Sequence, residues 1–277
     1  MAQPGLGPAL AATIITRDLD DSTGVYTGHL DQRMHAEAPI GPAEAAQIGW
    51  PELEGARSVW LANALGEPWL RLVEYAPAEP VPPVRRYGWL SLEIAVRDVD
   101  SLAQRLQGSP FEIIGPPRDL AMSDAIRAMQ VVGPSGEVLY LTEVKRPVPP
   151  FELPVARCPV DRLFIPVMTC PDREAALAHY TALSGNEGLR FDTQITVISR
   201  ALGLPENHAH PVATLQLAGA PLIEIDQVDG LAPAAVARPA TGIALIHFGH
   251  DTPVDRCLAG AAGERYLLTS RKEGNTP

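Results

Sequence analysis

A pattern of residues that occurs once in each half of this chain limits its fold more than any other feature. Ile-Gly-Trp-Pro-Glu at residues 48–52 returns as Leu-Gly-Leu-Pro-Glu at residues 202–206. Each copy is followed by a strand-like run and then by a Gly-x-Pro turn into alternating apolar residues, which begins at Gly66 and at Gly219. A turn followed by such alternation predicts a final strand. The chain is therefore predicted to be a duplication of a unit about half its length.

Each half contains two smaller modules that open with a strand running directly into a helix. Residues 13–16 are β-branched and predict a buried strand, and residues 18–22 offer side chains that cap a helix. A variant of this opening occurs at residues 94–102. The third opening lies near residues 160–167 and predicts a helix over 172–183, and the fourth begins near residue 242 and predicts a helix over 254–262.

Proline-rich segments mark the boundaries between these modules. Residues 76–83 and 231–241 are connectors within the halves, and residues 146–154 separate the halves, because exposed proline-rich segments commonly lie between domains. We therefore expect two domains, residues 1–150 and 151–277, each a pair of modules. The fourth module is short, since after its helix only residues 265–270 predict a strand, and it lacks sequence for its last two strands.

The module opening resembles that of the vicinal oxygen chelate superfamily, which includes glyoxalase I, bleomycin-resistance proteins and extradiol dioxygenases. The residues that carry the resemblance are Asp18-Leu-Asp-Asp-Ser followed by Val25-Tyr26, with a partial match at residues 98–102. The resemblance implies an α+β fold of two tandem pairs of βαβββ modules that form curved mixed sheets, here with a truncated fourth module. In that superfamily a concave sheet face binds a divalent metal through His or Glu of each first strand and Glu of each last strand.

In the N-terminal half the family positions hold no metal ligand. They fall on Ala11 and Arg71 in the first module and on Ser91 and Tyr140 in the second. The resemblance therefore implies a metal-free pocket in which Arg71, Ser91 and Tyr140 bind substrate. An arginine fork suits a carboxylate, so an anionic or oxygen-rich ligand is expected. The alternative is an arginine paired with a nearby acid and a tyrosine packed in the sheet.

In the C-terminal half one family position holds a carboxylate, Glu224, within an apolar alternating run. Burying such a group is costly unless it is paired or bound to a ligand. The first-strand position of the third module falls on Arg162 or Leu163, neither of which suits a metal. The last strand of the fourth module, which would supply a further carboxylate, is among those missing.

Three histidines extend this alternative site. The first-strand position of the fourth module falls between residue 244 and His247, and His208 and His210 lie on one face if they belong to a strand. Glu224, His247 and His210, with His208 beside them, are therefore fallback candidates for a metal site. The competing interpretation is that residues 207–210 form a polar loop and that His247 is a hydrogen-bonded strand histidine.

Composition excludes several classes of protein. The formal net charge of −11 opposes nucleic-acid binding, which needs clustered Lys and Arg. No apolar run is long enough to span a membrane, and no basic segment precedes the short apolar stretch at the N-terminus, so no signal peptide is expected. Cysteines at 158, 170 and 257 are odd in number and widely spaced, which predicts reduced thiols and a cytoplasmic location.

The leading hypothesis is a glyoxalase- or dioxygenase-like protein that binds or transforms a small oxygenated, anionic metabolite without a cofactor. One alternative is a lyase or extradiol-type dioxygenase that uses Fe, Zn, Mn or Ni in the C-terminal half. Another is a non-catalytic protein that sequesters a small molecule. We also expect a homodimer, because the shortened fourth module leaves apolar third-module strands to be covered, although the N-terminal half of the same chain is another possible cover.

Overall fold

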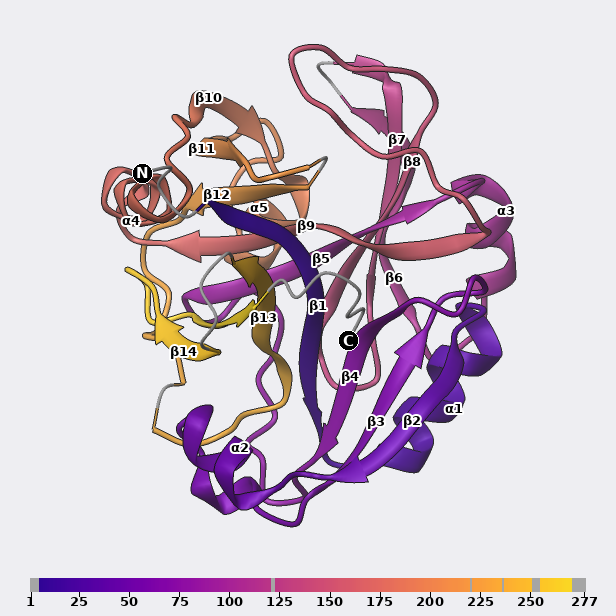
Figure 1. Cartoon of the computed structure of the whole chain (residues 1–277). Coiled ribbons are helices and arrows are strands. Elements are labelled where there is room, and N and C mark those ends of the chain that lie inside the picture. The colour runs from indigo at the N-terminus through magenta and orange to yellow at the C-terminus, as the bar shows by residue number, and fades with distance from the viewer. Residues whose placement is uncertain (1–4, 121–122, 220, 236, 251–254, 271–277) are drawn as a thin grey trace.

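The computed structural model describes residues 5–120, 123–219, 221–235, 237–250 and 255–270. Its strands form two curled sheets, one of seven strands and one of eight, and the helices are few (Figure 1). No helix in these ranges is long and apolar enough to cross a membrane. The α+β class and the modular build expected from the sequence are both confirmed.

The four predicted modules follow one another along the chain. Module 1 contains β1 (Leu6–Thr16), α1 (Leu19–His29), β2 (Arg33–Pro39), α2 (Pro42–Gln47), the short helix η1 (Pro51–Leu53), β3 (Arg57–Ala62) and β4 (Pro68–Glu74). Module 2 contains β5 (Gly88–Val96), α3 (Val99–Leu106), β6 (Glu112–Leu120), β7 (Ser123–Val132) and β8 (Val138–Val144). Module 3 contains β9 (Val160–Cys170), α4 (Arg173–Ser184), β10 (Leu189–Gln194), α5 (Thr196–Leu202), β11 (Ala209–Gln216) and β12 (Leu222–Gln227). Module 4 contains β13 (Gly242–His250), β14 (Arg256–Ala259) and β15 (Arg265–Ser270).

Each sheet joins one module from each half of the sequence. The seven-stranded sheet has the order β14-β15-β13-β1-β4-β3-β2, so module 4 lies beside module 1. The eight-stranded sheet has the order β10-β11-β12-β9-β5-β8-β7-β6, so module 3 lies beside module 2. Figure 1 shows β13 next to β1 although the two strands lie near opposite ends of the chain. The sheets therefore do not follow the division at residue 150.

The openings of modules 1 to 3 fold as the sequence predicts. Asp18, Asp98 and Asp172 each precede a helix in an extended conformation and accept a backbone N–H bond from its first turn. A carboxylate at this position satisfies an amide that has no partner inside the helix. The predicted helix over 172–183 is confirmed as α4.

The predicted helix over 254–262 is wrong. Residues 256–259 form strand β14, which pairs antiparallel with β15 through a turn from Gly260 to Glu264. Gly263 adopts φ +83° in this turn, a conformation that suits glycine and that a helix excludes. Strand β15 pairs parallel with β13 as β4 pairs with β1, so the last strand of module 4, which the sequence suggested was missing, is present. Module 4 thus has three strands among its described residues, where the sequence suggested two.

The apolar core lies between the two sheets and helices α1, α3 and α4. It takes alternate residues from strands of both sheets, such as Ile14 of β1 and Leu92 of β5. The third-module residues Ile223 and Ile225 belong to this core and need no partner chain to cover them. The homodimer stays a prediction. Because the third-module strands are covered within the chain, the need to cover them no longer supports a partner chain.

Two buried hydrogen bonds of the same kind connect the sheets. The Tyr26 hydroxyl of α1 donates to Glu137 Oε1 over 2.7 Å, and the Tyr180 hydroxyl of α4 donates to Glu264 Oε1 over 2.8 Å. The second oxygen of each carboxyl accepts a backbone N–H bond of 2.9 Å within its own turn. One bond links module 1 to module 2, and the other links module 3 to module 4.

Removing either tyrosine hydroxyl should therefore destabilise the whole chain. We expect Tyr26→Phe and Tyr180→Phe each to lower the free energy of unfolding by about 1–3 kcal/mol, the usual effect of leaving a buried carboxyl oxygen without its donor. Urea unfolding measures the change. Tyr75→Phe is the matched control, because no hydrogen bond from that hydroxyl to another described residue is present, and a control loss as large would contradict the role of the two bonds.

Candidate functional site

The sheet faces that point away from α1, α3 and α4 form two separate concave faces, each covered by a short helix. Helix α2 covers the seven-stranded sheet, and α5 covers the eight-stranded sheet. The repeated pentapeptides mark the ends of these helices, where Gly49 and Gly203 adopt φ +74° and +68°. A left-handed glycine commonly ends a helix. The repeated pentapeptides therefore lie at equivalent positions, each at the end of the short helix that covers one sheet.

On the seven-stranded concave face, the charge of Arg71 is neutralised within the chain. The Arg71 guanidinium forms an ion pair with Glu44 of α2 and donates from Nε and Nη2 to the Ser58 hydroxyl over 3.2 and 3.0 Å. It also lies 5.5 Å from the ring centroid of Trp60. The side chain faces the predicted side of the sheet, but an anionic ligand would have to compete with Glu44.

The histidine of this face is also hydrogen-bonded. His247 Nε2 lies 2.8 Å from the Thr13 hydroxyl, and its ring packs edge-on against Trp60. Burial, and secondly the nearby Arg71 charge, lower the pKa of His247 to about 3, so the ring is neutral at physiological pH. The space left beneath α2 is about 10 Å³, room for about one water molecule.

The predicted site residues divide between the two faces. Ser91 and Tyr140 lie on the eight-stranded sheet, and Arg71 lies on the seven-stranded sheet, so these three do not form one pocket. Glu224 and His247 are separated in the same way. The reason is the pairing of modules, because residues within one half of the sequence belong to different sheets.

The first-strand position of module 3 also needs correction. Arg162 is exposed, and Leu163 points into the core between the sheets. Ile165 is the residue of β9 that faces the concave side, opposite Glu93. Counting back from the helix cap Asp172 by the spacing used for Asp18 and Asp98 reaches this residue.

The concave face of the eight-stranded sheet carries three carboxyl groups. Glu224 and Asp226 are alternate residues of β12, and Glu93 lies on β5, two strands away across β9. Tyr140 of β8 is directly opposite Glu93 in the strand register. Because alternate residues of a strand share a face, these side chains project to the same side as Ser91. We call Glu93, Glu224, Asp226, Tyr140 and Ser91 the acidic face.

Several polar atoms of this region have no partner. Asp226 is completely buried, and neither carboxyl oxygen makes a hydrogen bond to the described residues. The hydroxyls of Ser91 and Thr214, 0% and 5% exposed, also lack hydrogen bonds there. Both lie in the same cross-strand row as Glu224. Buried polar atoms are rarely unpaired, so each calls for a ligand, a water molecule or a proton.

Burial and mutual repulsion raise the pKa values of the carboxyls on the acidic face above those of ordinary carboxyls. Burial, with the Glu224 charge second, raises the pKa of Glu93 to about 8, against a bond of 2.6 Å donated by the Thr142 hydroxyl. Burial raises the pKa of Glu224 to about 7. Burial, then Glu224 and Glu93, raise the pKa of Asp226 well above its usual value. Three neighbouring carboxyls titrate together, so these groups share protons near neutral pH.

His210 takes no part in the acidic face. It is 2% exposed on β11, and its Nε2 lies 3.0 Å from the Ser199 hydroxyl of α5. Burial, followed by the charge of neighbouring His208, lowers the pKa of His210. The contact fastens the cover helix to the sheet, and because β11 begins at Ala209, the polar loop considered for residues 207–210 ends before His210.

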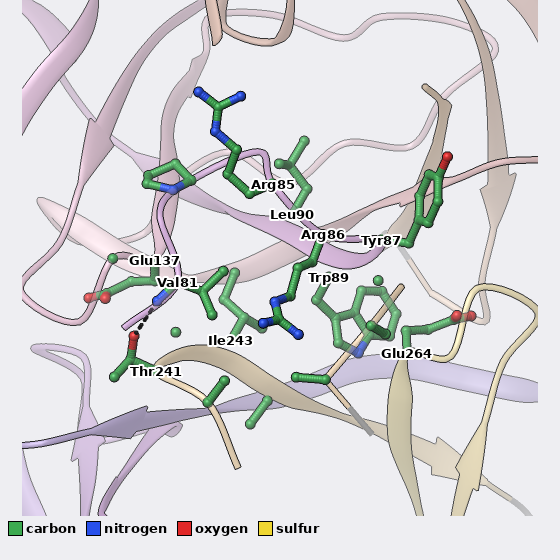
Figure 2. A pocket seen from close by; sticks show the side chains of 18 of the residues that line it. Val81, Arg85, Arg86, Tyr87, Trp89, Leu90, Glu137, Thr241, Ile243 and Glu264 are labelled. Atoms are coloured by element: carbon green, nitrogen blue, oxygen red, sulfur yellow. Dashed lines mark hydrogen bonds between the residues drawn. The ribbon is translucent and has the colours of Figure 1, made fainter. Parts of the chain in front are cut away.

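A further pocket of about 120 Å³ lies between the modules, where the connectors of the two halves meet (Figure 2). Equivalent turns of modules 2 and 4 line it, ending in Glu137 and Glu264, whose carboxyls point away from the pocket toward their tyrosine partners. Arg86 pairs with Glu79 over 3.0 Å. Figure 2 shows the guanidinium of Arg85 directed away from the other labelled side chains. Both carboxyls at this pocket therefore have hydrogen-bond partners within the chain, in contrast to Asp226 of the acidic face.

Comparison with known proteins identifies the architecture. No family model matches the sequence, and no curated protein matches it. The structure is similar to that of glyoxalase I from Zea mays, with a TM-score of 0.63 and 13% identity over 96% of this chain and 93% of that chain. It is also similar to a putative dioxygenase from Bacillus subtilis, with a TM-score of 0.60 and 12% identity over 97% and 86% of the two chains.

The chain has the vicinal oxygen chelate fold. That fold implies a divalent metal on a concave face, but the residues at the metal positions do not fit one here. On the seven-stranded sheet the metal positions hold Ala11 and Arg71. His247 lies beside Ala11 in the strand register, but its ring nitrogen is already hydrogen-bonded to Thr13. On the acidic face Glu224 is the single carboxylate at such a position. No group of three or more His, Cys, Asp or Glu among the described residues is arranged to hold a metal ion.

Sequence reasoning missed Glu93 and Asp226, two of the three carboxyls. Each lies two residues along its strand from a position considered, Ser91 and Glu224 respectively. Each also lies in an alternating apolar run, the same signal that singled out Glu224. A search of every predicted strand of the sequence for a carboxylate within an alternating apolar run therefore finds both residues without the structure.

The raised pKa of Glu93 predicts a change in pH-dependent stability. A carboxyl whose folded pKa is about 8 and whose ordinary value is 4.5 destabilises the fold progressively as pH rises between those values. We therefore expect Glu93→Gln, which still accepts a bond from Thr142, to unfold like wild type near pH 4 and to be more stable at pH 8 by roughly 2–4 kcal/mol. Chemical unfolding at both pH values measures this difference.

The control for this experiment is Glu112→Gln, a change at an exposed carboxyl of the edge strand β6. It should leave the pH profile of unfolding unchanged. Equal stability of wild type and Glu93→Gln at pH 8 would show that Glu93 is ionised without penalty and that the acidic face is well solvated.

Proposed function

We propose that this protein binds a small oxygenated molecule on the acidic face of the eight-stranded sheet and exchanges a proton with it, without a metal. The observation that carries the proposal is the set of buried polar groups without partners, in particular both oxygens of Asp226 beside Glu93 and Glu224. The concave position of these groups in a vicinal oxygen chelate fold supports it.

The chemistry of the acidic face suits proton transfer. A carboxyl with a pKa near the working pH is present both as an acid and as a base, and Glu224 and Glu93 are raised to about 7 and 8. Burial first, and then Asp226, Glu224 and Glu93, raise the pKa of Tyr140 well above 10, so its hydroxyl stays a hydrogen-bond donor. A carbonyl or hydroxyl oxygen of a ligand would accept from the protonated groups and donate to the ionised ones.

The anionic ligand expected from the sequence fits this face poorly. That expectation depends on Arg71, which lies on the other sheet and is paired with Glu44. A negative ligand beside Glu93, Glu224 and Asp226 would add repulsion to carboxyls that already repel one another. The proposal therefore concerns a neutral or positively charged oxygenated molecule.

Two alternatives predict different measurements. A metal-dependent lyase or dioxygenase would lose ligand binding when the protein is treated with a chelator, whereas the proposed site keeps it. A sequestering protein would bind without turnover, whereas the proposed site incorporates solvent deuterium into a bound carbonyl compound next to its carbonyl group. The cleanest observation is deuterium incorporation that persists after chelation.

Replacement of Glu224 should weaken binding at the acidic face. With dihydroxyacetone as a neutral oxygenated probe, we expect saturation-transfer NMR to detect binding to wild type and to Glu187→Gln, an exposed control. Binding should fall at least tenfold in Glu224→Gln, the usual effect of losing a hydrogen bond to a charged group. Equal binding by Glu224→Gln and wild type would place the ligand elsewhere.

A further inference from the structure

The charge of the acidic face is not compensated from within the chain. Among the described residues, no Arg, Lys or His forms an ion pair with Glu93, Glu224 or Asp226. The contrast with the other concave face is direct, because there an arginine and a glutamate meet in an ion pair. Ionising buried carboxyls without a counter-charge is costly, and carboxyls perturbed in this way are common at functional sites.

Groups on the surrounding elements do not supply the missing positive charge. His210 of β11 is neutral and bonded to Ser199, and Arg200 of α5 pairs with exposed Glu206. Arg118 of β6 donates to the Thr196 hydroxyl at the exposed start of α5. The side chain of β9 between the carboxyls is Val167, and α5 contributes Val197 and Ile198 above them. The carboxyls therefore face one another, Tyr140 and an apolar cover.

Two further hydroxyls lie in the same cross-strand row as Glu224, on the same face of the sheet. Ser91 lies across β9 from Glu224, and Thr214 lies beside Glu224 on the other side. Neither hydroxyl has a partner among the described residues, although each is more than nine-tenths buried. The carboxylates of β12 and β5, with the hydroxyl of Ser91 on β5 and that of Thr214 on β11, present acceptors from several strands, as an N–H-rich cation requires.

The apolar residues around the carboxyls indicate the character of the rest of the ligand. Ile165 and Leu222 lie in the cross-strand row next to that of Glu224, and Val197 and Ile198 of the cover helix pack with them in one cluster. Metal ions do not use such a surface, whereas an alkyl or aryl group does. An acidic end and an apolar wall together suit a molecule with both characters.

We propose that the ligand of the acidic face carries a positively charged nitrogen, an ammonium or a guanidinium, joined to an apolar body. This inference rests on the function proposed above and names its class of ligand. The nitrogen donates to Glu224, Asp226 and Glu93, and the apolar body lies under α5. Binding of the cation displaces protons from the carboxyls, so protein and ligand exchange a proton on association.

Three probes of similar size and different charge test the inference on the full chain. Hexylamine is a cation, 1-hexanol is neutral and hexanoate is an anion, and calorimetry measures their affinities. We expect hexylamine to bind at least tenfold more tightly than 1-hexanol, and hexanoate to bind most weakly. We also expect hexylamine affinity to rise about tenfold from pH 6 to pH 8, because the carboxyls ionise in this range while the amine stays protonated.

A measurement on wild type alone adds a second criterion. Hexylamine binding at pH 7 should release protons, which appears as a dependence of the measured heat on the ionisation enthalpy of the buffer. In Glu224→Gln the preference for hexylamine over 1-hexanol should fall at least tenfold, and in Glu187→Gln it should stay unchanged. Because glutamine matches the shape of the protonated carboxyl at this partly buried position, the Glu224 variant should fold.

The outcomes separate the two proposals. If 1-hexanol or dihydroxyacetone binds in a Glu224-dependent manner but hexylamine binds no better, the inferred charge is wrong and the proposed function stands. If no probe depends on Glu224, both fail. Stoichiometric binding of Zn²⁺ or Mn²⁺ that Glu224→Gln abolishes would overturn the organic cation in favour of a metal.

Discussion

The rest of the structure depends on two antiparallel strand pairings between distant modules, β1 with β13 and β5 with β9. These pairings close two sheets from four modules, and each concave face consequently combines residues from the first and second halves of the chain. The bonds of Tyr26 to Glu137 and of Tyr180 to Glu264 then hold together the modules that are neighbours in sequence but belong to different sheets. Backbone pairing builds the faces, and the buried side-chain bonds fix one sheet against the other.

The two concave faces share one architecture and differ in chemistry. Each lies under a short helix that ends at a left-handed glycine. Helix α2 brings Glu44 to Arg71, and the resulting ion pair leaves little free space on that face. Helix α5 brings Val197 and Ile198, whose apolar side chains do not neutralise the carboxyls of the acidic face. One face is thus compensated within the chain by an ion pair and the other is not, and the uncompensated face is the one for which we propose a ligand.

The sequence was sufficient for what depends on local chemistry and insufficient for what depends on pairing. Aspartate caps, Gly-x-Pro turns and strand alternation predicted the modules, and they placed Arg71 on the correct side of its sheet. Alternation cannot show which modules share a sheet, so Arg71 was grouped with Tyr140, and His247 with Glu224. The predicted helix over 254–262 failed because apolar residues 257 and 258 pair with β15 across a glycine turn, a contact with a later part of the chain.

The location of the proposed site follows from how hydrogen-bond donors are distributed among the buried carboxyls. Glu137 and Glu264 each accept one bond from a tyrosine and one from a backbone amide, so their burial is balanced by the fold itself. Glu93 accepts one bond from Thr142, and Asp226 accepts none from the described residues. Carboxyls of the same kind therefore have different roles within one molecule. Where the fold supplies the donors, the carboxyl holds modules together, and where it does not, the carboxyl is available to accept them from a water molecule, a proton or the ligand proposed above.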